Sequence, residues 1–289
     1  MIRTHDLKIL VVGVVRNGEK TLRNDIFRLK ESLSSFKSVS WYIVESDSID
    51  NTKYQLESLS QLVGDFSYIC LGNLSDTIKK RTERIAYCRN VYLDKINSKE
   101  SADIDYVIVS DLDGLNAEIT QQALLTCWEH DGWSACMANQ RGPYYDIYAL
   151  RHKFLSPNNL EDHYGFLLNI GISQYDAINS AIYSRMIRIP KSTKLLEVDS
   201  AFGGLAVCKK NIFINNKYKG VDAQNNAICE HVIFHESARK NGHKLYINTR
   251  MINAYFTEHT KNLRFTHLLF LFCKNVIKRI IHKLGIKWM

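Results

Sequence analysis

The first part of the chain alternates between short apolar runs and longer segments in which apolar residues recur at helical spacing. The apolar runs end in polar turns, as expected for strands buried on both faces, and they cover residues 7–15, 41–44, 66–71 and 106–109. The segments between them predict helices over residues 21–36, 52–62 and 78–96. Strand and helix therefore alternate up to the fourth run.

This alternation predicts an α/β fold with a mostly parallel, doubly wound sheet flanked by helices, as in Rossmann-like proteins. In such sheets the loops that follow the strands gather ligand groups at one edge. We therefore expect the polar segments at residues 16–19, 45–52 and 110–114 to converge on one site.

Beyond Gly114 the alternation loosens. The pattern there predicts helices over residues 117–128 and 229–241, an irregular polar connection over 150–175, and strands over 133–137, 146–149, 198–207 and 244–247. With three prolines and no internal repeat, nothing marks a linker between two domains. We predict one folded domain over residues 1–260 and an extension over residues 261–289.

Composition and charge restrict the compartment and the partners. The 289 residues are 45% hydrophobic and carry a formal net charge of +8, which suits nucleic acid, an acidic membrane face or phosphorylated substrates. Seven cysteines without a CxxC pair indicate reduced thiols. Neither a signal core nor a run of about 18 apolar residues occurs, so we expect a cytoplasmic protein.

The sharpest local signal is an acidic pair, Asp111-Leu112-Asp113, directly after the apolar run at residues 106–109. With one residue between them in an extended turn, both carboxylates can approach one cation, and oxygen ligands of this type suit Mg²⁺ or Mn²⁺. Asp103 and Asp105 match the same spacing but precede the strand, away from the expected ligand edge. Strand context therefore favours Asp111 and Asp113 as the metal ligands.

The order of these elements resembles the GT-A nucleotide-sugar glycosyltransferases over about residues 7–250. The turn at residues 44–52 resembles the acidic, Ser-rich turn that family members use around the base and ribose. Arg84 followed by Arg89-Asn90 resembles the basic helix of the retaining fungal capsule and mannoprotein mannosyltransferases.

The resemblance implies a nucleotide-sugar site. Val14, Arg16 and Leu112 would line it, and Glu45 and Asp47 would accept hydrogen bonds from ribose or base. The roles of Arg84 and Arg89 stay open. Each would either bind the diphosphate or hold the Asp111 carboxylate, because a guanidinium makes forked contacts to both kinds of anion. Lys80 and Arg81 are expected only to solvate a helix face.

The donor-sugar side of the site is expected from two later segments. Gly203 and Gly204 permit close backbone approach to the sugar, beside Asp199 or Phe202, although a tight structural turn explains the glycines nearly as well. Glu230 opens the late helix, where GT-A enzymes carry an acidic group near the acceptor. Asp199 and Glu230 are thus the catalytic candidates, and the Arg-Asn step favours retention of anomeric configuration.

A histidine often completes the metal site in this family, and His259 is our choice over His231. His231 and His235 lie four residues apart and would share a helix face, but the Glu of the zinc-protease signature is missing from the required place. A zinc protease is therefore disfavoured.

The predicted function is hexosyl transfer from a UDP- or GDP-sugar to a glycan or lipid-linked acceptor. Two alternatives are open: a nucleic-acid-binding module that uses the basic surface, and a metal-dependent nucleotidyltransferase. Finger spacings, RNP-like motifs and a recognition-helix signature are missing, and so is a Gly-rich phosphate loop with lysine. We therefore expect no nucleic-acid partner.

The extension is strongly basic. Lysines and arginines alternate there with apolar residues such as Val276, Ile277 and Ile280, so a helix would carry an apolar face flanked by cations. Such a basic amphipathic helix suits an anionic inner membrane leaflet, where lipid-linked acceptors are glycosylated. A terminal helix docked on the folded domain is the alternative.

Overall fold

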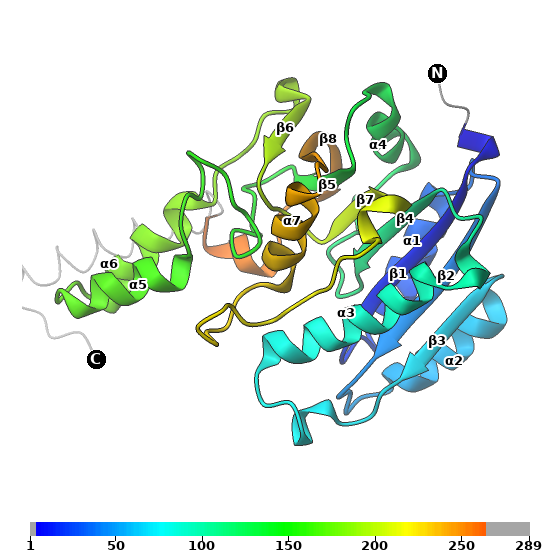
Figure 1. Ribbon diagram of the computed structural model, residues 1–289, viewed down its shortest axis with the longest axis horizontal. Coiled ribbons are helices and arrows are strands. Elements are labelled where there is room, and N and C mark those ends of the chain that lie inside the picture. Colours follow the sequence, from blue (N-terminus) through cyan, green and yellow to red (C-terminus); the bar gives the residue numbers. More distant parts are fainter. Residues whose placement is uncertain (1–3, 264–289) are drawn as a thin grey trace, which may run out of the picture.

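The computed structural model describes residues 4–263, which form one eight-stranded sheet covered by helices on both faces (Figure 1). The strands lie in the order β3-β2-β1-β4-β7-β5-β8-β6. Their bounds are β1 Lys8–Val15, β2 Ser38–Glu45, β3 Phe66–Cys70, β4 Tyr106–Asp111, β5 Ala135–Gln140, β6 Leu195–Val198, β7 Leu205–Lys209 and β8 Leu245–Ala254.

The helices are α1 Leu22–Ser32, α2 Thr52–Leu62, α3 Arg81–Asn97, α4 Gln121–Leu125, α5 Leu160–Asn169, α6 Gln174–Ala181 and α7 Glu230–Lys240. Short 3-10 helices cover Thr4–Asp6, Leu74–Asp76, Lys99–Ser101, Thr126–Glu129, Tyr183–Arg185, Lys191–Thr193, Lys210–Phe213 and Glu258–Leu263. Within the described residues, no helix is long and apolar enough to cross a membrane.

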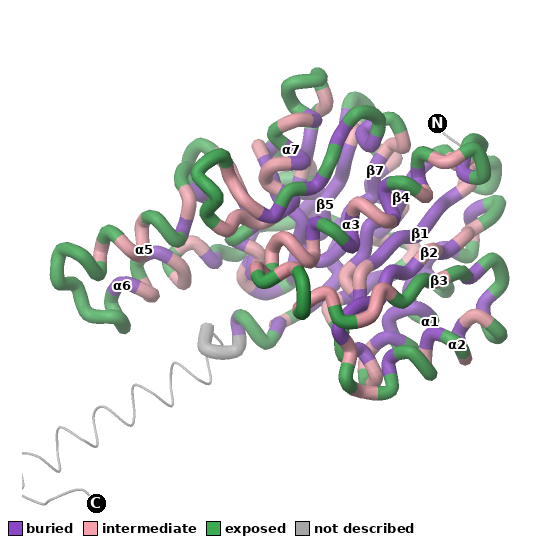
Figure 2. Tube along the Cα trace, turned by 60° about the horizontal axis from the view of Figure 1, so that its bottom comes forward, coloured by how far each residue is buried: buried purple, intermediate pink, exposed green. Residues whose placement is uncertain are grey.

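The sheet separates two hydrophobic cores. Along β1, Ile9 and Val11 face one core with α1 and α2, while Leu10 and Val12 face the other core with α3 and α7. Because both faces of the strand are covered, the run reads as continuously apolar, as predicted. Figure 2 shows the resulting band of buried residues through the middle of the molecule.

Strands β1 to β4 are mutually parallel in the order 3-2-1-4, which confirms the predicted α/β sheet. On the far side of β4 the pairing changes, since β7 runs antiparallel to both β4 and β5, and β6 runs antiparallel to β8. Parallel pairing returns only between β5 and β8. The carboxyl ends of β1, β2 and β4 lie at one edge and present the loops that follow them.

Three predictions for the second half are wrong. Residues 146–149 form a turn instead of a strand, because Asp146 accepts the N–H of Leu150 on its carbonyl. The segment 150–175 contains α5 and the start of α6 instead of an irregular connection. The expected strand over 198–207 is interrupted by a loop between β6 and β7. The predicted helix in residues 264–289 lies outside the described residues.

Candidate active site

A pocket of about 540 Å³ lies beyond the carboxyl ends of β1, β2 and β4. The beginning of α7 and the loop around Asp146 form its other wall. The predicted site residues that line it are Val14, Arg16, Asp47, Arg84, Arg89, Asp111, Leu112, Asp113, Glu230 and His259. Segments far apart in the sequence therefore meet at the edge where parallel strands present their loops.

The acidic pair sits at the mouth of β4. Asp111 is the last residue of the strand, and its N–H donates to the carbonyl of Gly204 over 2.9 Å. Leu112 borders the pocket, but its side chain is buried in the core beside α1. Alternation along the extended chain therefore turns Asp111 and Asp113 to the same side, toward the pocket.

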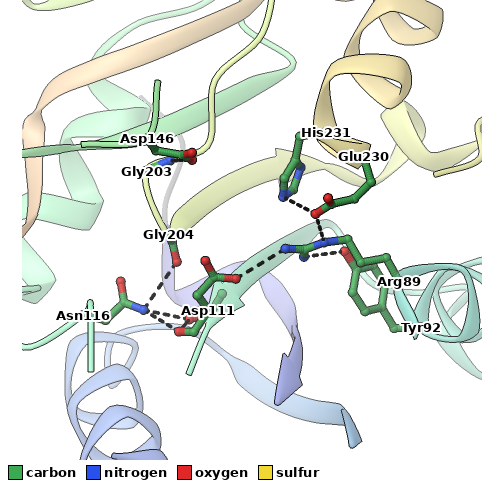
Figure 3. A network of polar contacts seen from close by, with 10 residues as sticks. Arg89, Tyr92, Asp111, Asn116, Asp146, Gly203, Gly204, Glu230 and His231 are labelled. Atoms are coloured by element: carbon green, nitrogen blue, oxygen red, sulfur yellow. Dashed lines mark hydrogen bonds and ion pairs between the residues drawn. The ribbon is translucent and has the colours of Figure 1, made fainter. Parts of the chain in front are cut away.

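Arg89 on α3 connects the two walls of the pocket (Figure 3). Its Nε donates to Glu230 Oε1 over 2.7 Å, and one Nη donates to Asp111 Oδ1 over 3.3 Å. The other Nη donates to the Tyr92 hydroxyl over 3.1 Å. We call Arg89, Tyr92, Asp111 and Glu230 the Arg89 cluster. The rigid guanidinium fork holds both carboxylates in fixed positions.

Aromatic rings enclose the Arg89 guanidinium, which lies 5.2 Å above the centre of the Phe202 ring. His231 stacks on the same ring at 4.0 Å. Burial alone would lower the pKa of Arg89, but Tyr92 and the carboxylates of Glu230 and Asp111 raise it well above its ordinary value. Arg89 is therefore a permanent buried cation.

Four acidic side chains nevertheless crowd this part of the pocket: Asp111, Asp113, Asp146 and Glu230. Burial raises the pKa of Asp111 to about 8; Arg89 opposes the rise, and Asp113, Asp146 and Glu230 add to it. The pKa values of Asp113 and Asp146 are also raised, chiefly by burial. Carboxylates crowded in this way are stabilised by a cation.

This donor set fits a divalent cation. Within residues 4–263, no cluster of three His, Cys, Asp or Glu side chains is arranged as a complete metal site. Mg²⁺ is usually bound through one or two carboxylates, with substrate phosphates and water filling the other positions. Asp111 and Asp113 match that chemistry, and His259 borders the same pocket with its ring stacked on Tyr145 at 5.4 Å.

The glycine pair, Gly203 and Gly204, contacts the backbone at the acidic pair. Gly203 and Gly204 have φ values of 70° and 82°, and a Cβ on Gly203 would come within 2.6 Å of the Ala138 carbonyl. The Asn116 amide donates to the carbonyls of Asp111 and Gly204, as Figure 3 shows. Neither glycine is among the residues that line the pocket, so the tight structural turn is the interpretation that the geometry favours.

The opposite wall is built on Asp47, which has a φ of 60° and accepts the Ser75 N–H on Oδ1 over 2.7 Å. Arg16 Nε donates to the Asp47 carbonyl over 3.2 Å, and Arg84 Nε lies 3.9 Å from Asp47 Oδ2. Burial would raise the pKa of Asp47, but the bonds from Ser75 outweigh it and lower the pKa. Asp47 therefore stays a carboxylate at this wall.

Comparison with known proteins was made by sequence and by fold. No protein-family model matches the chain, and no curated protein matches its sequence. The fold is similar to the mannosyltransferase PcManGT from Pyrobaculum calidifontis, solved with GDP-Man and Mn²⁺. That match has a TM-score of 0.50 and 12% identity over 87% of this chain and 57% of the other. The chain therefore has a GT-A-like glycosyltransferase fold.

Two further solved structures are more distant. The S. aureus TarS fragment 1–349, with UDP-GlcNAc, has a TM-score of 0.48 and 12% identity over 87% of this chain and 59% of that one. Glucosyl-3-phosphoglycerate synthase from Mycobacterium tuberculosis, with UDP, has a TM-score of 0.41 and 10% identity over 98% and 82%. This chain spans less than two thirds of the mannosyltransferase and of the TarS fragment. None of the three is a fungal capsule enzyme, so that finer resemblance stays a prediction.

Besides the two glycines, two predicted site residues do not line the pocket. The Glu45 carboxylate is fully buried behind the pocket wall and accepts the Ser48 N–H over 3.0 Å. It shapes the turn that carries Asp47. Asp199 forms an ion pair with Arg239 on the surface, where both side chains are nearly half exposed. Asp199 thus lies outside the pocket lining, contrary to the expectation that it faces the same site as the acidic pair.

The structure also adds residues that the sequence did not single out. Asp146 is half-buried at the pocket and accepts the Gly203 N–H over 2.9 Å. An acidic residue within the mainly apolar stretch from Tyr144 to Leu150 is a sequence feature that could have indicated a site residue, but the expected strand over 146–149 drew attention away from it. Arg81, expected only to solvate a helix face, lines the pocket as well.

Proposed function

We propose that the chain is a metal-dependent glycosyltransferase that moves a hexose from a UDP- or GDP-sugar to a glycan or lipid-linked acceptor. One observation carries the proposal: two acidic residues at the mouth of β4, Asp111 and Asp113, share a pocket with arginines from α3. The GT-A-like fold supports the same assignment. The proposed domain covers residues 1–260, and the basic extension covers residues 261–289.

The donor diphosphate would lie between the acidic pair and the arginines. Mn²⁺ or Mg²⁺, when bound by Asp111 and Asp113 with His259 as a third ligand, would neutralise the diphosphate and make it a better leaving group. Arg84 would add a fixed positive charge from the opposite wall. Val14, Arg16 and Asp47 line the same pocket, and base and ribose would lie beside them.

The chain's own contribution to transfer is positioning in a partly enclosed site. Arg89 fixes Glu230 and Asp111 relative to each other. Glu230 would orient the acceptor hydroxyl, and Asp146, which lines the same pocket, would be a second carboxylate near the sugar. Such an arrangement can stabilise the positive charge that develops on the sugar ring in the transition state.

We propose that transfer retains the anomeric configuration, on the strength of the Arg89-Asn90 step and of these two carboxylates. The configuration of the released or transferred sugar, followed by proton NMR before mutarotation, tests this part alone. An inverted product would reject retention and leave the donor site intact.

Screening UDP- and GDP-hexoses for Mn²⁺-stimulated hydrolysis tests the central proposal. Asp113→Ala should reduce donor turnover by about a hundredfold or more, because it removes one of the two charged ligands. The same variant should lose the thermal stabilisation given by Mn²⁺ and nucleoside diphosphate together.

The matched control is Asp103→Ala. Asp103 belongs to the other Asp-x-Asp pair, which precedes β4 at the opposite end of the strand from Asp111, and it forms an ion pair with Lys8. Control activity should equal that of the unmodified protein. Full turnover by Asp113→Ala, or equal losses in both variants, would reject the metal assignment. Salt-sensitive binding to arbitrary DNA with no donor effect would favour a nucleic-acid-binding module instead.

A further inference from the structure

Helices α5 and α6 form a hairpin that projects from the body of the molecule, on the side away from α2 (Figures 1 and 2). Gly171 ends α5, with a φ of 85° and its N–H bonded to the Leu168 carbonyl. Ser173 then caps α6 by accepting the Asp176 N–H over 3.1 Å. The hairpin is thus a defined element, which we call the α5–α6 arm.

The base of the arm is anchored to the protein. Ile147, Leu160 and Met186 form a small buried cluster there. Arg185 reinforces it by donating to the Asn158 side chain over 2.7 Å. A fixed base means that the direction of the arm is set by the fold.

The tip of the arm is apolar and exposed. Residues 164–175 contain no Asp, Glu, Lys or Arg. Within that stretch the exposed fractions are 58% for Phe166, 38% for Leu168, 57% for Ile170, 39% for Ile172 and 73% for Tyr175. Water therefore covers five large apolar side chains without a charge among them.

This concentration differs from ordinary surface scatter. The described chain has 16 exposed large hydrophobic residues, and five of them lie between residues 166 and 175. Single exposed apolar residues need no explanation, but a contiguous patch on a soluble protein marks a binding surface. Five such residues within ten positions at the end of one projection therefore indicate a binding surface.

We propose that the tip of the α5–α6 arm inserts into the interfacial layer of a lipid bilayer. Insertion suits its shape, because a stable protein interface buries about 800 Å² per partner and the tip offers only five partly exposed side chains on a narrow projection. It also suits its chemistry. The tip combines aliphatic side chains with Phe and Tyr rings, the composition that occupies the boundary between head groups and acyl chains.

The arm itself carries Glu161, Asp162 and Asp176, which lie outside the apolar stretch 164–175, and cations flank the arm in the chain, where they can attract an anionic leaflet. Exposed cations follow or precede the arm in the chain at Lys153, Arg188, Lys191 and Lys194. Residues 264–289 add six Lys or Arg and no Asp or Glu. Stable membrane attachment generally takes two signals, and here one would be apolar insertion and the other electrostatic attraction.

The arm also leads to the pocket. Asn159 and Glu161 at the start of α5, and Met186 just after the arm, line the pocket, and the ten residues of α5 span roughly 15 Å. An inserted tip would hold the pocket about one helix length from the head groups. Resting on the proposed function, this placement favours an acceptor that is carried by a lipid.

Co-sedimentation with phosphatidylcholine vesicles, with and without phosphatidylserine, tests the proposal on the full chain. The double variant Phe166→Ser/Ile170→Ser should bind phosphatidylserine-containing vesicles at least about tenfold more weakly, since two apolar anchors are lost. Phe166→Leu/Ile170→Leu should bind as the unmodified protein does, because apolar character is kept.

The control is Tyr54→Ser/Leu62→Ser on α2, which removes two side chains of similar exposure, 68% and 50%, far from the arm. Vesicle binding of the control should be unchanged. All variants should keep the circular dichroism spectrum and any donor hydrolysis measured without lipid, so a failed donor assay would not affect the membrane result.

Two outcomes would overturn the proposal. The first is equal vesicle binding by the serine variant and the unmodified protein. If Lys278→Glu/Arg279→Glu/Lys283→Glu then loses vesicle binding, the attachment belongs to the tail alone. Dissociation of a dimer by the serine variant in sedimentation velocity, without vesicle binding by either form, would make the arm an interface between copies.

Discussion

Two arginines on the same helix face the same pocket and are held in different ways. Arg89 is 3% exposed, and each of its three guanidinium nitrogens donates one hydrogen bond, two to carboxylates and one to a tyrosine hydroxyl. One Nη of Arg84 donates to the neutral carbonyls of Ile78 and Lys79, both at 2.8 Å, and its nearest ion pair is the 3.9 Å contact with Asp47.

Under the proposed function, this difference makes Arg89 a positioning cation and Arg84 a cation that binds the donor. The charge of Arg89 is already balanced, so its main effect is to fix Asp111 and Glu230. The charge of Arg84 is compensated mostly by carbonyl dipoles, so it can still attract an anion in the pocket. Two arginines on one helix can thus have separate roles, one fixing other side chains and the other attracting an anion.

Arg89→Met should have the largest effect. It leaves Glu230 and Asp111 as buried carboxylates without their cation, and breaking a buried pair in this way costs about 3–5 kcal/mol of unfolding free energy. Urea denaturation measures the loss, and donor turnover should disappear as well. Arg89→Lys should not rescue it, because one ammonium cannot reproduce the guanidinium fork. A stability equal to that of Arg84→Met would contradict the distinction between the arginines.

Arg84→Met should weaken donor use while sparing the fold. Loss of a charged hydrogen bond to phosphate costs about 1.5–3 kcal/mol, so kcat/KM should fall roughly tenfold to a hundredfold. Initial rates over a range of donor concentrations measure this. Urea denaturation should show a change below about 1 kcal/mol. A stability loss that matches the activity loss would mean that Arg84, too, is structural.

The pKa of His235 tests whether the charge of Arg89 acts on side chains beyond its hydrogen-bond partners. Burial lowers the pKa of His235 to about 3, and Arg89 adds to the shift; the neighbours in contact are Ser200 and His231. Between that pKa and about 6.5 the unfolded chain binds the proton and the folded chain does not. His235 therefore destabilises the fold by up to about 1.4 kcal/mol per pH unit as pH falls below 6.5.

His235→Gln can keep the bond to Ser200 and cannot take up that proton. Denaturation midpoints at pH 7 and pH 5 should therefore differ less in the variant than in the unmodified protein. Parallel midpoints in the two proteins would show that His235 titrates normally in the fold.

Asp199→Asn should have the smallest effect. A half-exposed ion pair contributes about 0–1 kcal/mol, and Asp199 lies outside the pocket. Donor turnover should stay within about twofold and the melting temperature should barely move. A large loss of turnover with normal stability would restore Asp199 as a catalytic candidate and demand a movement of the loop after β6.

The sequence predicted the first half of the molecule closely. Strands β1 to β4 and helices α1 to α3 lie within a few residues of their expected bounds, because each apolar run is covered on both faces and each helix buries one stripe. The convergence of Arg16, Asp47 and Asp111 follows from that topology alone. Glu45 was misplaced because alternation at a strand end turns it away from the pocket.

The second half was harder for a physical reason. The apolar residues of α5 do not form a stripe against a core, since the arm projects into solvent, so helical periodicity gave no signal. Gly203 and Gly204 broke an expected strand because their positive φ values cannot continue one. Glu230 was found by its position in the chain, but its bond to Arg89 depends on tertiary contacts that no local pattern encodes.

The bond between Arg89 and Glu230 joins residues that are 141 positions apart. Strands β1 and β2, by contrast, pair Lys8 with Ser38, so the first sheet half closes over short loops. Because short loops form earlier than long ones, the pocket should be the last part of the domain to assemble during synthesis. A nascent chain that ends before α7 would carry Arg89 beside Asp111 without its second carboxylate.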